Sequence, residues 1–288
     1  MKVLILGVTG MLGSAIYNDF SQHQQFEVWG TLRSNSGKNY FPINTHTHLI
    51  SNIDILDNDS LIAVMLKVKP DVVINCVGLI KQFADANDPL LALPLNAMLP
   101  HRIAKLCSLI NARLVHISTD CVFSGSKGMY AEDDVSDAED LYGKSKYIGE
   151  LHDLPHAVTL RTSIIGHELN TSSSLVDWFL SQAGQVKGYK KAIFSGLPTI
   201  ELARVIRDFV IPNVNLRGLY HVSVAPIDKY SLLNLIADVY GKKIDIEADE
   251  KIQIDRSLDS TKFRRATGYE SPSWPKLIEK MHHMHEGM

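Results

Sequence analysis

The sequence contains few cysteines and no excess of positive charge. Three cysteines, Cys76, Cys107 and Cys121, occur in 288 residues, and no two of them have CxxC spacing. This usage is typical of a reducing compartment and does not suit a disulfide framework. The formal net charge is −3, and no basic run is longer than a pair such as Lys190 and Lys191. Because a nucleic acid requires a basic surface that neutralises its phosphates, we do not expect the protein to bind one.

Long apolar runs are also missing, although 45% of the residues are apolar and can form a core. No stretch approaches the ~20 consecutive apolar residues that span a bilayer. The run Val3–Leu6 ends at Gly7 and is too short for the apolar part of a signal peptide. We therefore expect a cytoplasmic protein with no membrane contact. We expect no metal site, because His46 and His48 lack nearby partners and the histidine-rich tail 281–288 is predicted to be disordered.

The first twenty residues carry the clearest motif. The apolar run Val3–Leu6 predicts a buried parallel strand, and Gly7, Gly10 and Gly13 follow it with G-x-x-G-x-x-G spacing. Apolar residues then return at helical intervals. A glycine-rich turn between a strand and a helix lets backbone N–H groups and the positive end of the helix approach a pyrophosphate. A tight turn without a ligand shows the same spacing, but the apolar strand directly before it favours a dinucleotide site.

Strands and helices alternate through much of the chain. We expect strands at 26–32, 53–55, 71–78 and 113–120, and helices at 61–68, 94–110, 140–150, 201–210 and 231–240. This alternation predicts an α/β fold, a Rossmann-type doubly wound parallel sheet with a smaller C-terminal substrate-binding lobe. The predicted NAD(P)-binding domain covers residues 1–165, with 199–225 returning to it, and the predicted lobe covers 166–198 and 226–288.

Arg33 stands at the end of the expected second strand, about 20 residues after the glycine turn, where a carboxylate would favour NAD. A guanidinium can instead pair with the 2′-phosphate of NADPH and stack on adenine. We therefore predict NADPH as the cofactor, with NADH as the alternative. An exposed arginine without a ligand is the other interpretation.

A second group of reactive residues lies in the middle of the chain. The strand expected at 113–120 becomes polar at its carboxyl end, with Thr119 and Asp120, and that end of a parallel strand faces the ligand crevice. Tyr142 and Lys146 follow one loop later, four residues apart and so on one helix face. A phenol with a pKa of about 10 is a poor acid at neutral pH, and a nearby ammonium stabilises its phenolate. The order indicates that these groups share a carbonyl.

Several motifs together resemble the extended short-chain dehydrogenases/reductases. They are Gly7–Gly13, Asn75–Gly78, Asn96–Pro100, Ile117–Phe123, Tyr142–Lys146 and Arg161–Gly166. Within that superfamily the chain resembles the dTDP-4-dehydrorhamnose reductase family. The motifs that carry this closer resemblance are Ser118–Phe123, Arg161–Ser163, Gly196–Thr199, Glu201–Ala203, Gly218–His221 and Ser257–Lys262. The resemblance covers nearly the whole chain.

The resemblance implies an NAD(P)H-dependent oxidoreductase that reduces the C4 ketone of a nucleotide-linked 4-keto-6-deoxy sugar in surface-polysaccharide biosynthesis. Tyr142 would deliver the proton, Thr119 would hydrogen-bond the carbonyl oxygen, and Lys146 would hold the nicotinamide ribose and lower the tyrosine pKa. The expected cofactor contacts are Gly7, Thr9, Gly10, Met11, Leu12, Gly13, Arg33, Asp54, Ile55, Cys76, Val77, Gly78, Asn96, Tyr142 and Lys146. The expected substrate contacts are Thr119, Asp120, Cys121 and Arg256, the last toward a phosphate.

Two positions depart from the family's pattern. Cys121 and Ile164 stand where the family often has aromatic residues near the sugar, and these smaller side chains would admit a bulkier sugar. A UDP-linked 2-acetamido-2,6-dideoxy-hexos-4-ulose is therefore an alternative substrate. The same superfamily includes 4-epimerases with tightly bound NAD+. It also includes the regulatory subunit of methionine adenosyltransferase, which is non-catalytic and binds a cofactor. The nucleotide base, dTDP or UDP, and the oligomeric state are left open, with a homodimer among the alternatives.

Overall fold

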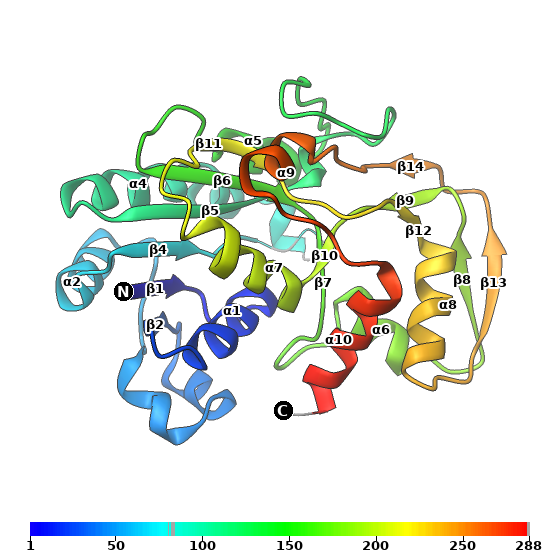
Figure 1. Cartoon of the computed structure of the whole chain (residues 1–288), viewed down its shortest axis with the longest axis horizontal. Coiled ribbons are helices and arrows are strands. Elements are labelled where there is room, and N and C mark those ends of the chain that lie inside the picture. The colour runs from blue at the N-terminus through cyan, green and yellow to red at the C-terminus, as the bar shows by residue number, and fades with distance from the viewer. Residues whose placement is uncertain (80, 82–83, 287–288) are drawn as a thin grey trace.

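The structure is a computed structural model that describes residues 1–79, 81 and 84–286 (Figure 1). It has the predicted α/β fold, built on a parallel sheet of seven strands in the order β11-β6-β5-β4-β1-β2-β3. The strands are β1 (Lys2–Leu6), β2 (Glu27–Thr31), β3 (Leu49–Ile50), β4 (Val72–Asn75), β5 (Arg113–Thr119), β6 (Ala157–Thr162) and β11 (Gly218–His221). In a doubly wound sheet of this order, ligands bind at the carboxyl ends of the strands.

The side chains of β1 alternate between two hydrophobic clusters, one on each face of the sheet. Val3 and Ile5 join the cluster of α1 and α7, whereas Leu4 and Leu6 join that of α2 and α4. All four are fully buried, as expected for a parallel strand covered on both faces. Figure 1 shows α1 lying along α7. The helices flanking the sheet are α1 (Met11–Ser21), α2 (Asn58–Val68), α3 (Pro89–Ala92), α4 (Leu99–Leu109), α5 (Leu141–Ile148) and α7 (Thr199–Val205).

The third strand lies elsewhere than the sequence predicted. Residues 53–55 were expected as a strand, but the short strand is β3, which pairs with the end of β2. Residues 53–55 instead lead into α2: the Asp54 carboxylate accepts the Leu56 N–H at 2.9 Å, and Asp57 caps the helix. The prediction was wrong because an apolar–polar–apolar triplet also suits a turn whose two apolar side chains pack on the core.

The helix predicted over 94–110 is present but is not regular throughout. A π-helical stretch, η4 (Leu93–Met98), precedes α4. Pro94 and Pro100 each stand in the first turn of one of these two segments. Asn96 lies within η4 and is 1% exposed. Such π-helical turns are frequent at functional sites.

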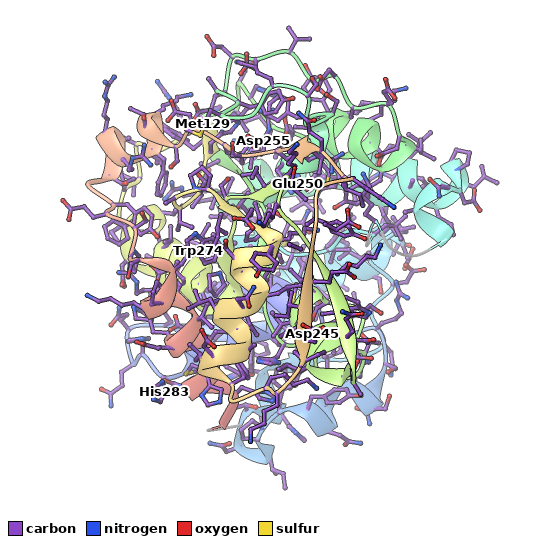
Figure 2. The ribbon with its side chains drawn as sticks, turned by 90° about the vertical axis from the view of Figure 1, so that its right-hand side faces the viewer. Met129, Asp245, Glu250, Asp255, Trp274 and His283 are labelled. Carbon is purple, nitrogen blue, oxygen red and sulfur yellow. The ribbon has the colours of Figure 1, made fainter. Side chains whose placement is uncertain are left out.

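After β6 the chain leaves the central sheet, returns through α7 and η6 (Ile206–Val210) to add β11, and leaves again. The remaining elements are β7 (Ile164–Ile165), α6 (Leu175–Ser181), β8 (Gln185–Tyr189), β9 (Ala192–Phe194), β10 (Leu197–Pro198), β12 (Ile227–Asp228), α8 (Lys229–Val239), β13 (Asp245–Asp249), β14 (Ile254–Asp255), α9 (Thr261–Thr267) and α10 (Trp274–Glu286). Figure 2 shows α8 beside the β8–β13 pair, with Asp245 and Glu250 at the two ends of β13. The domain boundaries given above stay a prediction.

Residues 281–286 of the histidine-rich tail are helical, contrary to the prediction of a disordered end, and residues 287 and 288 lie outside the described residues. Leu277 and Ile278 on α10 are fully buried, and Met281 is 3% exposed. The ring of His285 stacks on that of His167 at 3.7 Å between centroids. The apolar face of α10 therefore fixes the segment against the rest of the protein. None of the helices in the described ranges is long and apolar enough to cross a membrane.

Candidate active site

The three glycines of the turn after β1 differ in why glycine stands at each position. Gly7 has a φ of +83°, which favours glycine, and a Cβ at Gly13 would lie 2.1 Å from the Gly7 carbonyl oxygen. Gly10 has an ordinary φ of −75°, and a Cβ there would meet that oxygen at a normal 3.5 Å. Neither conformation nor packing therefore requires glycine at position 10. The space beside Gly10, at the N-terminus of α1, fits the close approach of a dinucleotide pyrophosphate.

The other expected cofactor residues lie after β2, after β3 and at the start of α1. Arg33 is exposed just after β2. The 3-10 helix η1 (Asn35–Tyr40) comes close to the turn, since a Cβ at Gly37 would lie 3.0 Å from the Thr9 methyl carbon. Asp54 is exposed, and Ile55 packs on the second hydrophobic cluster. Met11 is half-buried and Leu12 buried at the start of α1.

The segment after β4 connects the glycine turn to α5. A Cβ at Gly7 would touch the Val77 side chain at 3.0 Å, and a Cβ at Gly78 would lie 3.7 Å from Lys146 Nζ. Asn96 holds this segment in place: its Oδ1 accepts the Leu79 N–H at 3.0 Å, and its Nδ2 donates to Ser145 Oγ at 3.1 Å. Asn96 therefore links the loop after β4 to α5.

Thr119, Tyr142 and Lys146 meet at the carboxyl end of β5. The Thr119 side chain acts on the Tyr142 phenol and works against the rise of its pKa. Lys146 Nζ donates to the Ile117 carbonyl oxygen at 2.8 Å, and Lys146 is 6% exposed. The Asp140 carboxylate caps α5 by accepting the Gly143 N–H at 2.7 Å, which fixes where the helix begins. A phenol, a hydroxyl and an ammonium are thus held together on rigid elements.

Burial dominates the ionisation of these groups. Burial raises the pKa of Tyr142, and the Thr119 side chain opposes the rise. Burial also lowers the pKa of Lys146 to about 8, against Glu150 and Cys76, which raise it. Burial has the largest effect on the Tyr142 phenol, and the lowering of its pKa by Lys146 stays a prediction.

The expected substrate residues lie next to this group. Asp120 is 7% exposed; burial raises its pKa, while the Arg256 charge and hydrogen bonds from Thr119, Cys121 and Ser163 lower it. Arg256 Nε donates to the Phe123 carbonyl oxygen at 2.7 Å, which anchors the guanidinium near Asp120. The structure therefore brings Arg256 to the carboxyl end of β5, although 135 positions separate it from Cys121.

Two lysines near Asp120 and Asp140 were not predicted from the sequence. Lys229, the first residue of α8, acts electrostatically on Asp120, Arg256 and Cys121, and burial lowers its pKa. Lys81 Nζ lies 2.5 Å from an Asp140 oxygen. One local signal for Lys229 existed: a cation in the first turn of a helix opposes the helix dipole, which is an unfavourable choice unless something else requires it.

The arrangement can stabilise negative charge that develops on one oxygen atom. Two hydroxyl groups and a buried ammonium converge beside a turn that fits a dinucleotide, and cations surround the adjoining Asp120. Among the described residues, no group of three His, Cys, Asp or Glu side chains is arranged to hold a metal ion.

Comparison with known proteins supports this reading of the fold. The family described as "RmlD substrate binding domain" matches residues 1–284. Methionine adenosyltransferase 2 subunit beta of Danio rerio is 29% identical over 252 residues, which cover 83% of this chain and 74% of the relative. A dTDP-4-dehydrorhamnose reductase structure from Clostridium acetobutylicum has a TM-score of 0.82 at 22% identity, covering 99% of this chain and 100% of the other.

A second reductase structure, from Bacillus anthracis in complex with NADP, has a TM-score of 0.80 at 21% identity and covers 98% of this chain and 99% of the other. At these identities the two structures show a shared fold. Because the family match spans nearly the entire sequence, the chain belongs to the RmlD substrate binding domain family, as its motif resemblance to dTDP-4-dehydrorhamnose reductases predicted.

Proposed function

We propose that the protein is an NAD(P)H-dependent reductase of the C4 ketone of a nucleotide-linked 4-keto-6-deoxy sugar. The observation that carries the proposal is the convergence of Thr119 and Tyr142, with Lys146 buried one helical turn from the tyrosine. The family match and the two reductase structures of the same fold support it.

The roles of the residues follow from their chemistry. A bound reduced nicotinamide would supply the hydride. The N-terminus of α1 and the open side of Gly10 hold the pyrophosphate, and Lys146 holds the adjoining ribose through its ammonium. Thr119 donates a hydrogen bond to the carbonyl oxygen. As that oxygen gains negative charge, Tyr142 gives it the phenol proton: the tyrosine O–H bond breaks and the O–H bond of the product alcohol forms. Water then returns a proton to the phenolate.

Arg256 and Lys229 are proposed to bind the substrate's diphosphate. The Nε atom of Arg256 donates to the Phe123 carbonyl oxygen, and Lys229 acts electrostatically on Asp120. Arg256 and Lys229 both act on the carboxylate of Asp120, and Arg256 also acts on Asp137 and Asp140. Cys121 is small and partly buried beside them, which keeps a 2-acetamido sugar among the proposed substrates.

The decisive experiment is a substrate panel. The purified protein is mixed with dTDP- and UDP-linked 4-keto-6-deoxy sugars, with and without a 2-acetamido group, and with NADPH or NADH. Loss of the reduced-cofactor absorbance and formation of the C4 alcohol are measured. Turnover of one class supports the proposal and names the sugar, whereas no turnover of any member contradicts it. Tightly bound NAD+ in the purified protein, together with interconversion of C4 alcohols, would instead indicate a 4-epimerase.

A second proposed function is a cofactor-binding regulatory subunit. It is favoured by the similarity to methionine adenosyltransferase 2 subunit beta. The two proposals differ in their use of Tyr142, since a regulatory subunit needs no proton donor. Co-purification with a methionine adenosyltransferase catalytic subunit, without turnover in the panel, would select this function. A cytoplasmic location and a homodimer stay predictions, the latter to be tested by sedimentation equilibrium.

A further inference from the structure

Glu150 continues the row of functional side chains on α5. It follows the end of the helix by two residues, and its N–H still donates to the Tyr147 carbonyl oxygen at 3.1 Å, so Tyr142, Lys146 and Glu150 succeed one another every four residues. Gly149 allows this placement, because a Cβ there would lie 2.0 Å from the Asn96 carbonyl oxygen. The end of α5 thus packs closely against η4, and this contact fixes the position of Glu150 along the axis of α5.

The Glu150 carboxylate is fully buried and fully hydrogen-bonded. Its side chain is 0% exposed, and it accepts from Ser118 Oγ at 2.6 Å and from Arg161 Nε and Nη2 at 2.9 and 2.6 Å. The adjoining β5 residue Ile117 accepts the hydrogen bond from Lys146. The ammonium and the carboxylate are therefore hydrogen-bonded to consecutive residues of one strand, and no ion pair within 4.0 Å joins them among the described residues.

Three titratable groups from different elements act on Lys146: Glu150 after α5, Cys76 after β4 and His116 on β5. Burial raises the pKa of the Cys76 thiol to about 12 and lowers the pKa of His116 well below its ordinary value, so both are neutral at pH 7. Burial acts to raise the pKa of Glu150, but hydrogen bonds from His152 and Arg161 and the charge of Arg161 outweigh it and bring the pKa to about 2. Among these groups, only Glu150 carries negative charge at neutral pH.

We propose that Glu150 is a positioning residue of this site, whose buried carboxylate keeps the Lys146 ammonium charged at neutral pH. Burial alone favours the neutral amine, and a neutral amine would neither hold the ribose hydroxyls as a cation nor stabilise a phenolate. Arg161 and Ser118 serve to hold the carboxylate in place. The proposal deepens the proposed function, but its primary test does not depend on turnover.

The test is the titration of Lys146 in protein labelled with [13C]lysine, with the Lys146 Cε resonance assigned by its absence in Lys146→Met. The wild-type midpoint is expected near pH 8. In Glu150→Gln the negative charge is gone, so the ammonium loses its proton at lower pH and the midpoint falls by about one pH unit or more. The matched control is Ser118→Ala, which removes one hydrogen bond from Glu150 but leaves its charge and should move the midpoint by less than about 0.3 units.

Glu150→Gln leaves the buried Arg161 without an ionised partner, which can prevent folding. If Glu150→Gln does not fold, Glu150→Asp replaces it, because this variant keeps a carboxylate for Arg161. The shorter side chain moves the charge away from Lys146 by one methylene, so the Lys146 midpoint should fall by about half a pH unit. A midpoint at the wild-type value in the folded variants overturns the proposal. With an active substrate, the alkaline limb of kcat/KM moves down by the same amount as the titration. A shifted titration without turnover on any substrate contradicts the proposed reductase function alone.

Discussion

A Cβ atom at Gly13 would lie 2.1 Å from the carbonyl oxygen of Gly7, whereas a Cβ at Gly10 would meet the same oxygen at 3.5 Å. The two glycines belong to one motif, but the packing of the fold requires glycine only at position 13. This difference separates the structural part of the motif from the part that serves a ligand.

Gly13→Ala and Gly10→Ala should therefore fail in different ways. The first forces the helix away from the turn and should lower the Tm by several degrees, as expected for a strain of about 1–3 kcal/mol. The second should leave the Tm within about 1 °C of wild type but weaken NADPH binding at least about tenfold, because the methyl group occupies the pyrophosphate's place. Thermal unfolding and a fluorescence titration of NADPH measure the two effects. Wild-type NADPH affinity in Gly10→Ala would contradict the cofactor site.

Tyr142→Phe should lower kcat by a factor of about 10²–10⁴ while NADPH still binds, because only the proton donor is removed. Tyr147→Phe is the matched control: it lies on the same helix, its side chain is 41% exposed, and its activity should be unchanged. Steady-state kinetics on the active member of the substrate panel gives both values. Retained turnover in Tyr142→Phe would refute the assignment of the donor.

Arg33→Ala should raise the KM for NADPH about tenfold and leave that for NADH nearly unchanged. The reason is that the guanidinium would pair with the 2′-phosphate, which NADH lacks. The two cofactors serve as each other's control in the same variant. Equal effects on both would remove the basis for predicting NADPH.

Lys229→Met should raise the KM for the nucleotide sugar about tenfold without changing the KM for NADPH, since the lost cation faces Asp120 and Arg256. Lys243→Met, an exposed position just after α8, is the control and should behave as wild type. Initial-rate kinetics with each substrate varied in turn separates the two constants. If the KM for the sugar stays the same, Lys229 does not contact the substrate.

The parts of the fold that the sequence predicted are those decided by neighbouring residues. The apolar run of β1, the glycine turn and α1 are specified within Val3–Phe20, and α5 is specified by its own spacing. The third strand was misplaced because β3 and the segment 53–55 are both short and apolar. Their difference is decided by pairing with β2, which is not local information.

The residues of the site divide in the same way. Thr119, Tyr142 and Lys146 were found because strand ends and helix spacing are visible in the sequence. Lys229 was not, because its place near Asp120 depends on the fold bringing the first residue of α8 to a segment more than a hundred residues earlier. The prediction of a disordered tail was wrong for another reason: Leu277, Ile278 and Met281 have the spacing of a buried helical face, and this face holds the histidines of α10 in a helix.

The edge position of β11 has a consequence for synthesis of the protein. This strand pairs with β6, and its four residues come more than fifty positions later in the chain. Until they leave the ribosome, the backbone N–H and C=O groups along that side of β6 have no partner, and such an open edge invites pairing with other nascent chains. A truncated product that stops before Gly218 should consequently aggregate, even though it contains every residue assigned to proton transfer.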